Sequence, residues 1–315
     1  MTRRTRSGAF LLILALLLMV SAASATVKKE IHKEFTVQPG GELLVNTEIG
    51  SIEVLTGSGN QVTVDVILDS RTTKESRAED MFEDFSIEFE QSGDNVNVYA
   101  EYDGNNRGWF NFGNRRNLQV KFQVRVPEKY DIFLETSGGS IGVGDVIGEV
   151  DVKTSGGSLH FEDIDGPIKG RTSGGSITIL SCNGNADIRT SGGSIDIGRV
   201  QGTVDAHTSG GSIKVDEVMG SIDATTSGGS IRASITKQPA NDCVLKTSGG
   251  SVTLELADNI DVDIDAHTSS GRVSSDFDDS NRQTKRKSSL RTSIGKGGPE
   301  IYMRTSGGNI RINKM

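Results

Sequence analysis

Apolar and polar residues alternate in short runs along this chain, and through its middle the runs repeat with an 18-residue period. Counted from the Thr of a recurring Thr-Ser-Gly-Gly motif, the apolar positions are the fifth, seventh, tenth, fourteenth and a mostly small sixteenth. Alternation with a period of two is typical of β-strands. The residues that mark the period are Thr136, Thr154, Thr172, Thr190, Thr208 and Thr226, followed after a slightly longer step by Thr247.

Each period holds two short strands separated by glycine-containing corners, which cannot bury an apolar face alone. When the periods stack coil on coil, they bury one continuous apolar column. The pattern therefore predicts an all-β protein, a single-stranded parallel β-helix (β-solenoid) with 18-residue coils. Because strand-crossover-strand connections favour the right hand, we expect a right-handed coil.

The Thr of the motif is predicted to be a structural corner residue. In the stretch from Gly202 to Gly211, Val204 and Ala206 point inward, so Thr208 also points inward. Its hydroxyl can bond to the neighbouring coil or to a corner backbone group. The Gly-Gly pair is expected to supply the positive φ of the bend. A phosphate-binding loop is disfavoured, because a strand and not a helix follows the glycines.

Degenerate copies of the motif extend the repeat toward both ends of the chain. An early copy reads "NTEIGSIEV" from Asn46, and the copy "TSSGR" begins at Thr268, one more long step after Thr247. Thr305 opens the last copy, "TSGGNI". We divide the chain into a signal peptide (1–25), an N-terminal β-rich cap with the first coil (26–135) and the solenoid repeats (136–315).

The N-terminal part does not follow the 18-residue period. Thr73 to Phe85 has the composition of a short helix, expected to cover one end of the solenoid. The next segment alternates as two strands around a turn at residues 92–95, and Leu118 to Pro127 is a further alternating strand.

The start of the chain, 1–25, has the pattern of a secretory signal. Three arginines precede an apolar run from Ala9 to Val20, and a small-residue cleavage site ends at Ala25. The run is shorter than the ~20 residues of a spanning helix. We expect export to the periplasm or the cell surface with no membrane span after cleavage; an uncleaved anchor is the alternative.

The chain is acidic, with 34 basic and 42 acidic residues and a net charge of −8. Loss of three arginines with the signal makes it −11, which argues against nucleic acid as a general partner. A basic column one place before each Thr runs beside an acidic column three places before it, as at Arg189 and Asp187. We interpret the two columns as mutually neutralising on a solvated face. The basic stretch Asn281 to Arg291 is interpreted as a solvated loop.

No cofactor, metal or catalytic constellation is predicted. No Asp recurs at the corners, as calcium-binding solenoids require, and the four histidines lack ligand spacing. Cys182 and Cys243 fall on inward positions about three coils apart, which is too far for a disulfide. We expect two buried free thiols.

The candidate contact surface is the loop from Asn105 to Asn117. It holds the single Trp, and its candidate residues are Trp109, Phe110, Phe112, Arg115 and Arg116. The alternative is that this loop folds back over the core. A second loop, Asp276 to Ser289, is polar and is expected to be mobile.

The chain resembles bacterial exported domains of unknown function called putative adhesins, whose coils follow Thr-Ser-x-Gly-x-Ile. The residues that carry the resemblance are "NTEIGSIEV", "VRVPEKYDIFLETSGGSI", the 18-residue copies and "RTSIGKGGPEIYMRTSGGNIRI". The resemblance implies a β-solenoid of the cell envelope without catalytic residues.

The sequence thus favours a non-enzymatic, exported, adhesin-like binding or structural protein, with an envelope protein or a polysaccharide as partner. The alternative is a carbohydrate-active β-solenoid enzyme, which needs an acid/base pair outside the charge columns. Ice binding is disfavoured because the Thr column points inward.

Overall fold

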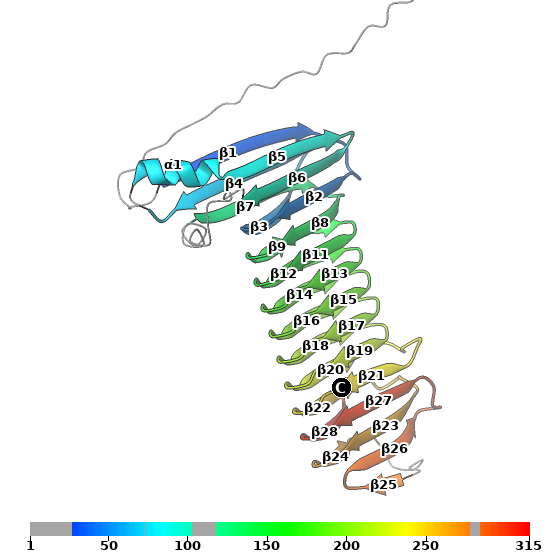
Figure 1. Cartoon of the computed structure of the whole chain (residues 1–315). Helices are drawn as coiled ribbons and strands as arrows, with labels where there is room; N and C mark the ends of the chain where they lie inside the picture. Colours follow the sequence, from blue (N-terminus) through cyan, green and yellow to red (C-terminus); the bar gives the residue numbers. More distant parts are fainter. Residues whose placement is uncertain (1–26, 73, 103–117, 278–283) are drawn as a thin grey trace, which may run out of the picture.

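The computed structural model describes residues 27–72, 74–102, 118–277 and 284–315. Within them the chain forms a rod of two facing sheets, each of 14 strands, with one short helix at one end (Figure 1). Parallel pairing between successive coils confirms the predicted all-β solenoid.

The two sheets take alternate strands of each coil. In spatial order the first sheet contains β1 (Val27–Thr36), β4 (Gln61–Ser70), β7 (Leu118–Pro127), β3 (Ser51–Gly57), β9 (Ile141–Val143), β12 (Leu159–Asp165), β14 (Ile177–Cys182), β16 (Ile195–Val200), β18 (Ile213–Val218), β20 (Ile231–Ile235), β22 (Val252–Leu256), β28 (Ile310–Lys314) and β24 (Val273–Ser275), with β10 (Val146–Ile147) paired to β12. The second contains β25 (Thr284–Arg286), β26 (Ser289–Ile294), β23 (Val262–Thr268), β27 (Glu300–Thr305), β21 (Cys243–Lys246), β19 (Ile222–Thr225), β17 (Val204–His207), β15 (Ala186–Arg189), β13 (Ile168–Arg171), β11 (Val150–Thr154), β8 (Asp131–Thr136), β2 (Glu42–Thr47), β6 (Asn95–Tyr102) and β5 (Phe85–Ser92).

Neighbouring coils pair in the register of the 18-residue period. Ile177 lies opposite Ile195 in one sheet, and Ala186 lies opposite Val204 in the other. The five inward columns predicted from the sequence are buried, so the core is a narrow stack of small and β-branched side chains. Each coil is too thin to have a core of its own, and its stability depends on its neighbours.

The motif forms the corner between the two strands, with its Thr side chain buried. Thr154 Oγ1 donates a hydrogen bond of 2.8 Å to the carbonyl oxygen of Gly139, in the preceding coil. The same oxygen accepts a longer bond, 3.4 Å, from the Gly157 N–H of its own corner. The hydroxyl therefore joins two coils through their backbones and not through a neighbouring Thr.

The expected role of the Gly-Gly pair is wrong. In the part of the chain that the structure describes, the glycines with positive φ are Gly40, Gly50, Gly59, Gly93, Gly148, Gly166, Gly295 and Gly297, none of which belongs to a Thr-Ser-Gly-Gly corner. A Cβ on Gly157 would instead lie 2.0 Å from the Gly139 carbonyl oxygen. The second glycine of the motif is thus required by the close stacking of corners and not by a left-handed backbone.

The coils at the C-terminal end do not stack in chain order. β27 lies between β21 and β23, and β28 lies between β22 and β24, so the last coil in sequence lies between the two coils that precede it. The corner bonds follow the same order, with Thr305 Oγ1 donating to Gly250 O and Thr268 Oγ1 donating to Gly308 O. The copy that ends the sequence is therefore not the end of the rod.

The N-terminal end is built in a similar way. β6 and β7 pair in parallel with β2 and β3 on the outer side of the first coil, and the antiparallel partners β5, β4 and β1 extend the sheets further. The predicted turn at residues 92–95 joins β5 to β6. The predicted helix is α1 (Glu75–Glu83), which packs Ala78, Met81 and Phe82 against the end of the rod.

The remaining sequence predictions concern the two cysteines, the polar loop, the signal and the aromatic loop. Cys182 and Cys243 are buried and free, as predicted. The loop from Asp276 to Ser289 is not wholly irregular, because β25 pairs with β26 in an antiparallel hairpin. The signal (1–25) and the aromatic loop (105–117) lie outside the described residues. Among the described segments, none forms a helix that could span a bilayer.

Candidate functional site

The charge columns of the second sheet form a ladder of ion pairs. Asp187 accepts hydrogen bonds from Arg189 of its own coil at 2.9 Å and from Arg171 of the preceding coil at 2.8 Å. Arg189 also donates to Asp205 of the next coil at 2.9 Å. These pairs are partly exposed, so each contributes at most ~1 kcal/mol. Their acids are engaged by neighbouring bases, which suits a solvated face.

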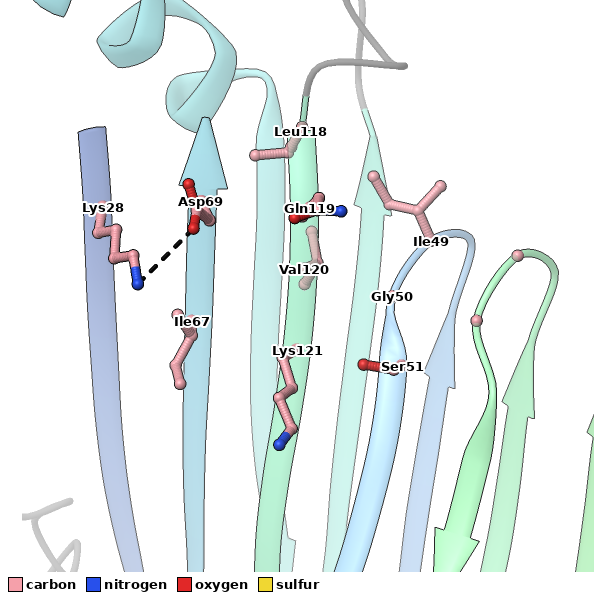
Figure 2. A pocket seen from close by; sticks show the side chains of 12 residues that line it. Lys28, Ile49, Gly50, Ser51, Ile67, Asp69, Leu118, Gln119, Val120 and Lys121 are labelled. Atoms are coloured by element: carbon pink, nitrogen blue, oxygen red, sulfur yellow. Dashed lines mark ion pairs between the residues drawn. The ribbon is translucent and has the colours of Figure 1, made fainter. Parts of the chain in front are cut away.

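An open groove lies on the outer face of the first sheet near the N-terminal end of the rod. Figure 2 shows strands β1, β4, β7 and β3 side by side at the groove, with the corners of the first two coils at its edge. Its volume is about 610 Å³. The lining residues are Lys28, Ile49, Gly50, Ser51, Ile67, Asp69, Leu118, Gln119, Val120, Lys121, Gly138 and Gly139.

The groove exists because long antiparallel strands meet short parallel coils. β1, β4 and β7 each have 10 residues, whereas β9 of the first regular coil has three. Gly50, at the corner before β3, has φ of +125°, and a Cβ there would lie 3.1 Å from Val120. Glycine is therefore required at this corner by its backbone conformation and by its approach to β7.

Charged side chains surround the apolar part of the groove. Lys28 Nζ lies 3.7 Å from Asp69 Oδ2, and Lys121 Nζ lies 2.7 Å from Glu53 Oε2. The hydrogen bond from Lys121 lowers the pKa of Glu53. Asp69 Oδ1 is buried and accepts no hydrogen bond from another described residue. The groove thus has fixed charges of both signs, with one carboxylate oxygen buried beside them.

The next group along the same face is a histidine between two carboxylates. His32 Nδ1 lies 2.5 Å from Asp65 Oδ1, and its Nε2 lies 3.1 Å from Glu34 Oε1. The hydrogen bonds with Asp65 and Glu34 raise the pKa of His32. All three side chains are exposed on the outer face, so the group adds charge to the surface without forming an enclosed site.

Among the described residues, Asp69 is the one carboxylate that lines the groove, whereas glycoside hydrolysis uses two carboxyl groups on opposite sides of the scissile bond. Within the described ranges, no group of three or more His, Cys, Asp or Glu side chains could hold a metal ion. Ile49 and Ile67 offer apolar contact at the surface, whereas Leu118 is buried in the core.

The residues predicted from the sequence are not brought into this groove. The Thr side chains of the motif are buried in the corners, where they support the backbone. The candidate contact residues Trp109, Phe110, Phe112, Arg115 and Arg116 lie outside the described residues. Their surface role stays a prediction.

One signal for the groove is present in the sequence and was missed. In β4 the outward positions are Gln61, Thr63, Asp65, Ile67 and Asp69, so an isoleucine interrupts an otherwise polar face. A large apolar side chain at an outward position of a strand suggests a contact surface when neighbouring strands add to it. The neighbours are contributed by distant segments, however, and their pairing cannot be read from spacing.

The family model described as Toastrack DUF4097 matches residues 41–313. No curated protein matches the chain. Several solved structures match with low identity.

Three of these structures cover nearly the whole rod. A structure named a putative adhesin from Bacteroides fragilis is 12% identical, with 90% of this chain and 97% of that chain covered and a TM-score of 0.36. A putative lipid binding protein from Parabacteroides distasonis is 13% identical, with 91% and 96% covered and a TM-score of 0.34. A putative adhesin from the same species is 8% identical, with 91% and 97% covered and a TM-score of 0.32.

Proposed function

The chain belongs to the Toastrack DUF4097 family, and from this premise we propose that it is a non-enzymatic, exported protein of the cell envelope that binds a partner protein through its N-terminal groove. The solenoid acts as a rigid support, as extended repeat proteins do. The observation that carries the proposal is the lining of the groove, which combines apolar side chains with two lysines and a single carboxylate, Asp69.

A protein segment suits this lining better than a glycan. An apolar floor with a charged rim is the usual composition of a protein contact, with the rim setting orientation. Sugars are commonly held against aromatic faces, and no aromatic side chain is among the described residues that line the groove. Binding of a polysaccharide is therefore the competing outcome of the test.

The test is capture of partners from an envelope fraction with immobilised protein. Ile67→Glu places a charge in the apolar part of the groove, and Leu180→Glu is the matched control, since Leu180 is an outward, 52% exposed residue of a regular coil. We expect a captured protein to be lost with Ile67→Glu and kept with Leu180→Glu. Equal capture by both variants, or capture of polysaccharide alone, contradicts the proposed partner.

The enzymatic alternative has its own test. Asp205 and Asp223 are register neighbours in the charge ladder, and Asp69 lies in the groove. We expect no hydrolysis of envelope polysaccharides by the wild-type protein. Hydrolysis that disappears with Asp69→Asn, or with Asp205→Asn and Asp223→Asn, would establish an enzyme instead.

Export rests on residues 1–25 and is tested on the protein made in a bacterial host. The mature chain recovered outside the cytoplasm is expected to begin at Thr26. An intact N-terminus on membrane-bound protein supports the uncleaved anchor, and an intact N-terminus in the cytoplasm contradicts export.

A further inference from the structure

The C-terminal end of the rod carries a second groove, far from the N-terminal one along the solenoid (Figure 1). Its volume is about 520 Å³. Three segments line it: the corner that Thr268 opens together with strand β24, the turn between β25 and β26, and the start of β28. The lining residues are Ser270, Gly271, Arg272, Ser274, Lys287, Asn309 and Arg311.

The out-of-order final coil is what brings these segments together. The Arg272 N–H donates to Asn309 Oδ1 at 2.9 Å, and the Ile310 N–H donates to Arg272 O at 3.0 Å. The N–H of Val273, the residue after Arg272, donates to Lys287 O at 2.9 Å. Ser274 is the register partner of Arg311. Backbone pairing thus fixes three cationic residues from three separate segments around one groove.

Hydrogen-bond donors dominate the lining of this groove. Arg272, Lys287 and Arg311 carry positive charge, the hydroxyls of Ser270 and Ser274 can donate, and the Asn309 amide oxygen is occupied, which leaves its NH₂ group as a donor. No carboxylate is among the described residues that line this groove. No ion pair joins Arg272, Lys287 or Arg311 to an acid among residues 27–72, 74–102, 118–277 and 284–315.

This arrangement contrasts with the coils of the rod. There outward arginines face acids of the adjacent coil, as Arg199 does with Glu217 at 2.8 Å and Arg232 does with Glu255 at 2.6 Å. Three neighbouring cations that no described acid pairs repel one another, and such a cluster is unusual in a chain whose net charge is −8. A cluster of cations that no described acid pairs is a candidate site for an anion.

We propose that this groove binds a phosphate group, either free or carried on a larger envelope molecule. Two guanidinium groups and one ammonium group match the charge of about −2 on a phosphate monoester, and the planar guanidinium fork pairs with two of its oxygens. The serine hydroxyls and the Asn309 amide supply neutral donors for the remaining oxygen. A lone carboxylate would leave two of the three cations without a partner.

The experiment is a titration of the full chain with inorganic phosphate, followed by ³¹P NMR at low ionic strength. We expect saturable binding that weakens by about tenfold in Arg272→Ala and again in Arg311→Ala, as loss of a charge-assisted hydrogen bond implies. Arg199→Ala is the matched control, because it removes an exposed arginine that is paired with an acid of the adjacent coil. Its affinity for phosphate is expected to equal that of the wild type.

A second arm identifies the source of the phosphate. Vesicles of phosphatidic acid, whose headgroup is a phosphate monoester, are compared with vesicles of phosphatidylcholine, with free phosphate as competitor. Selective binding to phosphatidic acid that Arg272→Ala abolishes assigns the site to a lipid headgroup. Phosphate binding without vesicle binding assigns it to a soluble or glycan-linked phosphate.

Three results would overturn the proposal: no saturable binding by the wild type, equal loss in Arg199→Ala, or unchanged binding in the Arg272→Ala/Arg311→Ala double variant. Because both side chains are exposed, the variants are expected to keep the wild-type melting temperature. A charge reversal, Arg311→Glu, gives an independent check and is expected to abolish binding.

Discussion

The Thr190 hydroxyl donates a hydrogen bond of 2.8 Å to the carbonyl oxygen of Gly175, one coil closer to the N-terminus. The same bond recurs at each regular corner, for example between Thr208 and Gly193 and between Thr226 and Gly211. Backbone carbonyls at the corners cannot join a sheet ladder, so the hydroxyl satisfies a group that would otherwise be unpaired next to the core. The repeated Thr is therefore part of the scaffold.

Replacing Thr190 by Val keeps the shape of the side chain and removes this bond. We expect Thr190→Val to lower the free energy of unfolding by ~1–3 kcal/mol in urea denaturation, because the Gly175 carbonyl loses its side-chain partner. Ser191→Ala is the control, since that side chain is exposed at the same corner. A Thr190→Val protein as stable as Ser191→Ala would show that the hydroxyl has no structural role.

The two glycines of one corner are predicted to differ sharply. A Cβ on Gly139 would lie 1.9 Å from the Gly50 carbonyl oxygen, whereas a Cβ on Gly138 meets no atom within 4 Å. We expect Gly139→Ala to destabilise by ~3 kcal/mol or more and Gly138→Ala to change stability by less than ~1 kcal/mol. Thermal melting of the two variants measures this, and equal melting temperatures would contradict the close-stacking explanation.

The strands and buried positions of the coil could be predicted from the sequence alone. The role of its glycines and the stacking order of the last coils could not. Alternation and the 18-residue period identify which side chains of a coil are buried, because inward positions follow from strand parity. The period cannot distinguish a glycine required by φ from one required by a neighbouring carbonyl, as at Gly157. The period also does not indicate which of two similar copies, the one at Thr268 or the one at Thr305, stacks on the coil that Thr247 opens.

The strand pairings that form the two grooves could not be predicted from the sequence, for the same physical reason. Ile67 and Leu118 belong to strands that become neighbours only through antiparallel pairing of β4 with β7. Arg272 and Arg311 meet only because β28 inserts before β24. Long-range pairing of this kind depends on which sheet edges are available during folding, and no local residue pattern encodes it.

A buried carboxylate holds the out-of-order coil in place. Asp265 on β23 has a side chain only 8% exposed and accepts hydrogen bonds from Arg291 on β26 at 2.6 Å and from Arg304 on β27 at 2.8 Å. Burial by itself would raise the pKa of Asp265, but the hydrogen bonds from Arg304 and Arg291 outweigh it and lower the pKa below its ordinary 3.8.

This pKa shift has a definite sign in the stability of the protein. A folded pKa below the unfolded one adds stability at neutral pH that disappears as the pH falls through the folded pKa. We expect Asp265→Asn to cost ~3 kcal/mol near pH 7, because two arginines lose their partner. Urea denaturation against pH is expected to show this difference shrinking below pH ~4. Asp216→Asn, at an exposed ion pair with Lys214, is the control, and a pH-independent difference would contradict the assignment.

The two cysteines are expected to be inert in the folded protein. Both side chains are buried, and burial raises the pKa of the Cys182 and Cys243 thiols. Since the thiolate is the reactive form, a thiol-specific chromophoric reagent should label neither residue under native conditions and both in denaturant. Rapid labelling of the native protein would contradict the packing of these two coils.

The central claim is that the N-terminal groove contacts a protein in the envelope, and site-specific photo-crosslinking tests it most directly. A photoreactive phenylalanine analogue replaces Ile67 in the groove or Leu180 on the outer face of a regular coil. Illumination of cells is predicted to join the Ile67 derivative to a defined envelope protein and to leave the Leu180 derivative unlinked. Crosslinks that are identical at the two positions, or absent from the groove in every growth condition, would contradict the claim.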